Sequence, residues 1–100
     1  MNKIWKEVGT SAIFWKPQKG DVIEGQLILT EENQGQNKNS MLYTLKHDDG
    51  SITKVWGSYV LDEKMQQIHK DAYVQIHFLG LGVAKGGKNA PRLYSVLVGE

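Results

Sequence analysis

The chain has 100 residues, of which 40% are hydrophobic and 23% charged, with a formal net charge of +1 and no cysteine. That length suits one domain with a single core, and the composition excludes a disordered chain, a disulfide-stapled fold and a cysteine-ligated metal. No apolar run approaches the roughly 18 residues of a membrane span, and the first residues lack the apolar centre of a signal peptide. We therefore expect a soluble, cytoplasmic protein that contacts no membrane.

The beginning of the chain is apolar and aromatic. Residues 4–8 have the apolar spacing of a short helix that ends at Gly9, and a second apolar cluster follows at residues 13–15. We interpret residues 1–19 as an arm that caps one end of the folded domain. The alternative is that this arm packs on a second copy of the protein, which gives a homodimer. Residues 20–100 then form the domain itself.

From Gly20 the pattern is that of strands. Residues 22–30 predict a long strand in which Gly25 marks a bulge or a sharp bend. Residues 31–40, EENQGQNKNS, are too polar to pack and too many for a tight turn, so we expect a mobile loop. A β-hairpin follows in residues 41–58, because Asp48-Asp49-Gly50 is a sequence typical of tight turns.

Alternation in the second strand of this hairpin separates two sets of side chains. If Val55 faces the core, then Lys54 and Trp56 both face solvent, because successive side chains in a strand point to opposite faces. An exposed aromatic ring beside a lysine suits a stacked base and a neutralised phosphate. The alternative is that Trp56 belongs to the core.

A short helix is expected next, in YVLDEKMQQIHK. Ser58 is a candidate N-cap, and His69 and Lys70 place positive charge at the end of about three turns, where it favours the helix macrodipole. Leu61 and Met65 lie on its apolar stripe.

Two further strands complete the chain. In residues 72–79, Tyr73 and His77 alternate with apolar residues and are expected to face outward. A glycine- and lysine-rich loop, VAKGGKNAP, separates this strand from the last one, residues 92–98. For Tyr43 and Tyr94 the pattern allows either face, and we expect both in the core.

Signatures of catalysis fail. Residues 82–89 have the GxxxxGK spacing of a phosphate-binding loop, but Asn89 replaces the Ser or Thr that such a loop needs, and Pro91 leads into a strand instead of a helix. The three histidines lack metal-ligand spacing, and no nucleophile motif is present. We therefore expect no enzymatic activity, no metal and no cofactor.

The order of strand, hairpin, helix, strand and strand is similar to that of the OB-fold. The segments FWKPQKGDVIEGQL and KVWGSYVLDEKM resemble the small OB-fold single-stranded DNA-binding proteins of bacteriophages and prophages. The matching features are the Gly20-Asp21 pair that opens the curved strand and the Gly57-Ser58 pair before the helix. The chain departs from the cellular relatives of that group because it lacks their acidic tail, so we expect no recruitment of enzymes through such a tail.

The resemblance implies an all-β fold with one short helix, a five-stranded OB-fold Greek-key barrel with its helix between the third and fourth strands. It implies sequence-nonspecific binding of single-stranded DNA in phage or mobile-element replication or recombination, with other proteins of those processes as further partners. The alternative function is an OB-like protein-interaction or virion structural module without nucleic-acid binding. The candidate contacts to DNA are aromatic and basic side chains: Lys46, Lys54, Trp56, Tyr73, His77, Lys85, Lys88 and Arg92.

Overall fold

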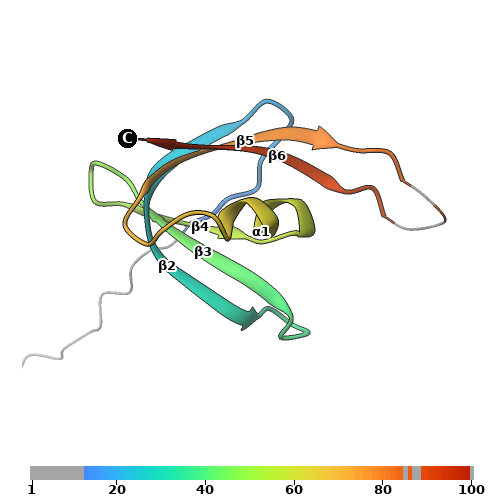
Figure 1. The fold of residues 1–100 in the computed structure, drawn as a ribbon, viewed down its shortest axis with the longest axis horizontal. Coiled ribbons are helices and arrows are strands. Elements are labelled where there is room, and N and C mark those ends of the chain that lie inside the picture. Colours follow the sequence, from blue (N-terminus) through green and yellow to red (C-terminus); the bar gives the residue numbers. More distant parts are fainter. Residues whose placement is uncertain (1–12, 85, 87–88, 100) are drawn as a thin grey trace, which may run out of the picture.

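The structure, a computed structural model, describes residues 13–84, 86 and 89–99. These residues form six strands and one helix: β1 (Ile13–Phe14), β2 (Val22–Gln34), β3 (Ser40–Lys46), β4 (Ile52–Trp56), α1 (Tyr59–Met65), β5 (Tyr73–Leu81) and β6 (Arg92–Gly99). The fold is therefore mostly β with one short helix, which confirms the fold class expected from the sequence (Figure 1).

All six strands belong to one open sheet, in the order β1-β4-β3-β2-β5-β6. The pair β1 and β4 is parallel, and the other neighbouring pairs are antiparallel. The sequence predicted five strands in a closed barrel. Within the described residues no ladder joins β4 to β6, so closure of a five-stranded barrel is not confirmed.

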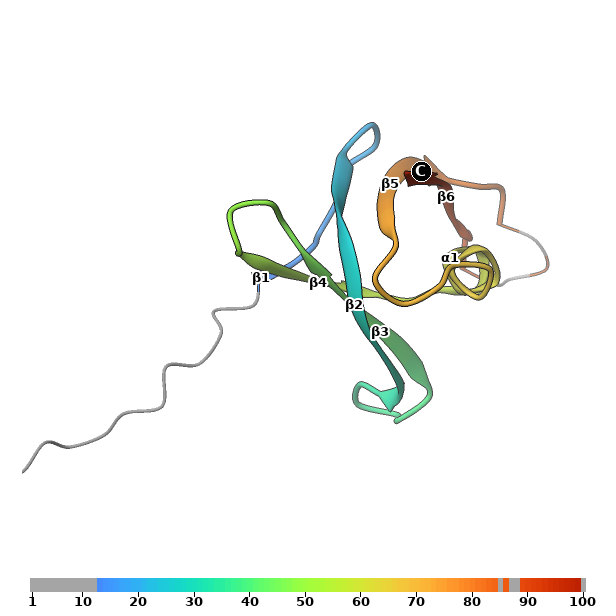
Figure 2. The same cartoon turned by 60° about the vertical axis from the view of Figure 1, so that its left-hand side comes forward.

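The long strand β2 holds the two halves of the sheet together. It pairs with β5 through residues 22–26 and with β3 from Gln26 onward, so its partner changes at Gln26 (Figure 2). Gly25 lies at this change of partner, where an added Cβ would be 2.9 Å from the carbonyl oxygen of Lys46. The glycine thus allows the two strands to approach closely, while the irregularity in the ladder itself lies further along, between Leu27 and Leu29.

The polar segment of residues 31–40 differs from the mobile loop that we expected. β2 continues through Gln34, which pairs with Ser40 of β3, so most of the segment belongs to a long hairpin. Three residues around the turn have positive φ values: Asn33 at 59°, Gly35 at 86° and Lys38 at 53°. Asparagine and glycine tolerate this backbone region, and polar side chains are compatible with strands that project from the core.

The helix α1 is shorter than the three turns that the sequence predicted. It ends at Met65, so His69 and Lys70 lie beyond it and cannot act on its last turn. Ser58 occupies the N-cap position with extended backbone, but its side chain makes no capping bond. Instead the Asp62 carboxylate accepts a hydrogen bond of 2.6 Å from the Tyr43 hydroxyl, which ties the helix to β3. The described part of the chain contains no helix that is long and apolar enough to cross a bilayer.

The hydrophobic core lies between the concave side of the sheet and α1, which packs beside β6 (Figures 1 and 2). Its members come from every long element: Ile23, Leu27, Tyr43, Leu45, Val55, Leu61, Met65, Val74, Ile76, Phe78 and Tyr94. Both tyrosines are buried, which confirms their expected place in the core.

The N-terminal segment takes part in the sheet. β1 pairs with Thr53 and Lys54, and the ladder continues where the Trp15 backbone N–H donates a bond of 2.8 Å to the Lys54 carbonyl oxygen. The Trp15 ring packs against the core, with its centroid 6.4 Å from that of the Tyr94 ring. The expected helix at residues 4–8 lies outside the described residues.

Candidate nucleic-acid interface

Alternation in β4 separates a buried side from an outward side, as the sequence predicted. Val55 is buried in the core, whereas Trp56 keeps 38% of its surface exposed. Residues directly opposite each other in neighbouring strands point to the same face of a sheet. The ladders therefore place Phe14, Leu29 and Glu31 on the same face as Lys54 and Trp56. These five residues define what we call the β4 outer face.

Two aromatic rings form the centre of the β4 outer face. Phe14 and Trp56 lie nearly parallel, with ring centroids 5.6 Å apart and an angle of 13° between the planes. Phe14 is 42% exposed, so both residues keep surface that solvent can reach. Stacked aromatic pairs of this kind have a rigid geometry at little entropic cost, which suits them to receive the flat face of another ring.

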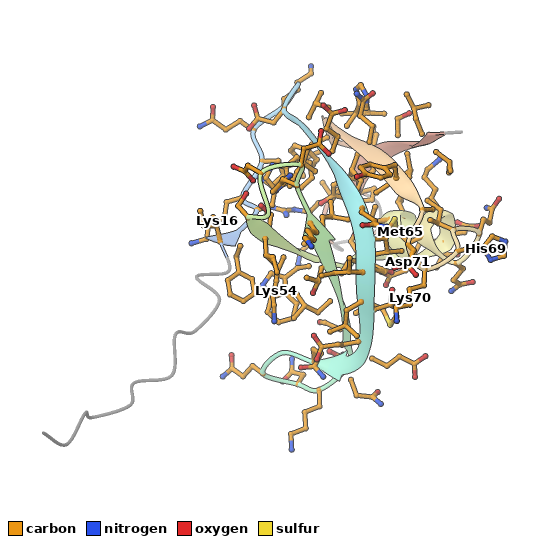
Figure 3. All side chains as sticks on the ribbon, turned by 90° about the vertical axis from the view of Figure 1, so that its left-hand side faces the viewer. Lys16, Lys54, Met65, His69, Lys70 and Asp71 are labelled. Atoms are coloured by element: carbon orange, nitrogen blue, oxygen red, sulfur yellow. The ribbon has the colours of Figure 1, made fainter. Side chains whose placement is uncertain are left out.

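Positive charge lies next to the rings. The Lys54 ammonium is 3.9 Å from a Glu31 carboxylate oxygen, and about 30% of each side chain is exposed. At this length and exposure the ion pair is weak, so a competing anion can displace it at small cost. Figure 3 shows Lys16 beside β1 and Lys54 beside β4, both on the side of the molecule away from α1. Lys46 is exposed at the end of β3. It lies four residues, or about 13 Å along the strand, from Leu42, the residue that pairs with Trp56.

A second layer of side chains lies beneath this surface. Leu42 and Thr44 share the face of Trp56 and Lys54 in the ladders, yet both are buried. Thr44 is only 4% exposed, and its hydroxyl has no hydrogen-bond partner among the described residues. The side chains of the β4 outer face thus cover two buried residues, Leu42 and Thr44, and the hydroxyl of Thr44 has no hydrogen-bond partner among the described residues.

The predicted residues of β5 have a different environment. Tyr73 does face outward, because it pairs with Gln26, and Gln26 pairs with the exposed Lys46 of β3. His77, four residues further along β5, points to the same face by alternation. However, the Tyr73 hydroxyl lies 3.4 Å from an Asp48 carboxylate oxygen, and His77 Nε2 donates a bond of 2.7 Å to the Gln75 side chain. The carboxylate beside Tyr73 disfavours a phosphate there, so β5 is a weaker candidate for contact with DNA.

The predicted basic residues of the last loop do not join the β4 outer face. Arg92 stacks over Phe78 at 5.5 Å, and Phe78 belongs to the core side of β5. Arg92 therefore lies on the opposite side of the sheet from Tyr73 and His77. Lys85 and Lys88 fall outside the described residues.

Sequence reasoning missed the contribution of Phe14 and Lys16. Both were assigned to the arm, because a strand of two residues is too short to show alternation. The available signal was the order IFWK, in which Phe14 and Lys16 alternate with Ile13 and the core-facing Trp15. The structure thus adds Phe14 to the residues that lie beside Trp56 and separates Arg92 from them.

The described residues show neither a cluster that could hold a metal ion nor the strand-to-helix context of a phosphate-binding loop. Within the described residues, no group of three or more histidine, aspartate or glutamate side chains is placed to hold a metal ion. The segment after Gly82 leads into β6 and not into a helix, which is unlike a phosphate-binding loop. Comparison of the chain with models of protein families, with curated proteins and with solved structures gives no significant match, so a function must be inferred from the geometry of the β4 outer face.

Proposed function

We propose that the protein binds single-stranded DNA, without sequence specificity, across the β4 outer face. The observation that carries this proposal is the exposed, stacked pair of Phe14 and Trp56 beside Lys54. Bases stack on exposed aromatic rings regardless of their identity, and lysines neutralise the phosphates between them. A mode of binding that uses stacking and charge alone protects and organises single strands in replication or recombination of a phage or mobile element.

The topology supports the same proposal. In OB-folds, oligonucleotides lie on the face of the second and third strands, and these folds are often only partly open barrels. Along the chain, β2 to β6 are five strands with a helix between the third and the fourth, which is the order of elements expected of an OB-fold. We infer a variant OB-fold in which β1 occupies part of the free edge of β4. The second and third strands of the OB-fold then correspond to β3 and β4, whose outward face carries Trp56.

The test is the affinity for a fluorescein-labelled oligo-dT of about 15 nucleotides, measured by fluorescence anisotropy. Trp56→Ala should weaken binding by about fivefold to a hundredfold, because one stacked base contributes about 1–3 kcal/mol. Tyr59→Ala is the matched control, since Tyr59 is an exposed aromatic residue of α1 and is not one of the five residues of the β4 outer face. Equal affinity of the wild-type protein and Trp56→Ala would refute the proposed interface.

Salt gives a second readout of the same experiment. Lys54 lies on this face, Lys46 lies further along it and Lys16 lies on the same side of the molecule. Three neutralised phosphates predict a slope of about −2 for log affinity against log salt concentration. A slope near zero would exclude binding through the phosphates.

One observation favours a second candidate function, a protein-interaction module. Phe14, Leu29 and Trp56 expose apolar surface on the same face of the sheet, and such patches also mark contacts between proteins. Sedimentation that shows self-association lost in Phe14→Ala, together with no response to any oligonucleotide at low salt, would select this function over DNA binding.

A further inference from the structure

A cavity of about 610 Å³ lies at the far end of the β3–β4 hairpin from Trp56. It forms where the turn after β3 meets the start of β5 and the end of β6. His47, Asp48 and Asp49 line it from the turn, and Tyr73 and Leu97 from the sheet. Figure 1 shows this turn and the end of β6 on the same side of the molecule. None of the residues that line the cavity belongs to the β4 outer face, so a ligand of the cavity would not be the one that binds to that face.

One wall of the cavity is aromatic and aliphatic. Tyr73 is 50% exposed, and Leu97 and Val98 expose similar fractions. Leu97 and Tyr73 share the outward face of their strands, because Tyr73 pairs with Gly99 two residues further along β6. A half-open aromatic ring next to leucine and valine presents a surface on which the aliphatic stem of a long side chain can lie.

The other wall is acidic. The carboxylates of Glu24, Asp48 and Asp49 line the cavity, and neither lysine nor arginine is among the described residues that line it. Hydrogen bonds from the Ser51 backbone N–H, at 2.9 Å, and hydroxyl, at 2.6 Å, hold the pKa of Asp49 below its ordinary value. Asp49 is therefore ionised at neutral pH.

His47 fixes the position of the acidic turn. Its Nδ1 lies 2.8 Å from the Glu24 carbonyl oxygen, which can only accept, so Nδ1 carries a proton. Its Nε2 lies 2.6 Å from the Thr53 hydroxyl. The ring thus holds the turn against β2 and β4.

We propose that this cavity is a docking site for an arginine side chain presented by a segment of a partner protein. Charge complementarity selects a cation and rejects phosphate groups, which excludes the DNA proposed for the β4 outer face. A guanidinium stacks on the Tyr73 ring and forms paired hydrogen bonds with the Asp48 or Glu24 carboxylate, while its stem covers Leu97. Arginine fits better than lysine because its planar guanidinium can stack on an aromatic ring and form paired hydrogen bonds with a carboxylate at the same time.

The experiment uses the full chain labelled with ¹⁵N and a capped peptide, acetyl-Gly-Ala-Arg-Ala-Gly-amide. Titration should produce saturable shifts of the amide signals of Gly25, Gln75 and Gly99, which line the cavity, and leave the Trp56 amide unmoved. The same peptide with citrulline, which has the shape of arginine without its charge, should bind at least about fivefold more weakly. Absence of saturable shifts with the arginine peptide would overturn the proposal.

Variants distinguish the cavity from general attraction to an acidic protein. The double variant Glu24→Gln/Asp48→Asn should lose most of the affinity for the arginine peptide. Tyr73→Leu should bind this peptide about fivefold more weakly than the wild-type protein. Glu32→Gln is the matched control, because this exposed carboxylate of β2 lies outside the cavity and should leave the affinity unchanged. Equal affinity of the double variant and the control would refute the site. Saturable shifts with spermidine and none with the peptide would replace the protein partner by a free polyamine and so overturn the proposal.

Discussion

Removal of the Glu31 carboxylate should strengthen DNA binding, which is a stricter test than loss of affinity. Glu31 pairs with Lys54 at 3.9 Å, and it lies on the β4 outer face, opposite Leu42 and therefore in line with Trp56. Two unit charges at this distance attract by about 1 kcal/mol in water, which corresponds to about fivefold in affinity. Glu31→Gln frees the ammonium for a phosphate and also removes a repelling charge. We expect oligo-dT to bind about threefold to tenfold more tightly at about 0.05 M salt.

The matched control for this experiment is Glu32→Gln. It removes the same charge from the next residue of β2, which is exposed and is not one of the five residues of the β4 outer face. Anisotropy titrations of both variants should give a gain for Glu31→Gln that disappears near about 1 M salt, where the Debye length is about 3 Å. If both variants gain equally, net charge alone governs binding and the β4 outer face is not the site. A loss of affinity in Glu31→Gln would refute the reasoning outright.

Two predictions concern the scaffold of the site. Tyr43→Phe removes the 2.6 Å hydrogen bond to Asp62 and should lower the free energy of unfolding in urea by about 1.5–3 kcal/mol. Burial, together with the hydrogen bond to Asp62 and the charge of Asp62, raises the pKa of the Tyr43 hydroxyl in the folded state. The stabilisation by Tyr43 is therefore complete below pH ~10, and above that pH the difference in unfolding free energy from Tyr43→Phe should fall by up to about 1.4 kcal/mol per pH unit. A difference that stays constant with pH would contradict this. Gly25→Ala places a methyl group 2.9 Å from the Lys46 carbonyl oxygen and should lower the free energy of unfolding by about 1–3 kcal/mol. Gly99→Ala, whose added methyl group has its nearest contact at 3.4 Å, should lower it much less. Equal melting temperatures of the two variants would refute the close approach of the strands at Gly25.

The parts of the site that could be predicted from the sequence are those that depend on local alternation. The turn at residues 48–50 fixes where β4 begins, and a period of two then determines that Val55 is buried and Trp56 exposed. The same argument placed Tyr73 and His77 on the outward side of β5. What alternation could not show is the acidic neighbourhood of Tyr73, because Asp48 comes from a different hairpin.

The parts that could not be predicted depend on partners distant in sequence. Residues 31–34 form a strand because β3 pairs with them, although their composition resembles that of a loop. The irregularity of the β5–β6 ladder between Phe78 and Gly80 likewise changes the relation between sequence parity and sheet face in the last residues of β5. A rule based on local pattern alone has no access to either interaction.

The short strand β1 connects the proposed binding surface to the stability of the core. Phe14 stacks on Trp56 on the outward side of the sheet, and the next residue, Trp15, packs toward Tyr94 on the core side. Two adjacent side chains of one strand must point in opposite directions, so the pairing of β1 with β4, continued by the bond from the Trp15 N–H to the Lys54 carbonyl oxygen, positions both. The stacked pair of Phe14 and Trp56 is therefore held in place by contacts that also cover the core. Because the same pairing places Phe14 beside Lys54, the charge and the stacking surface that the proposed DNA binding requires are positioned together.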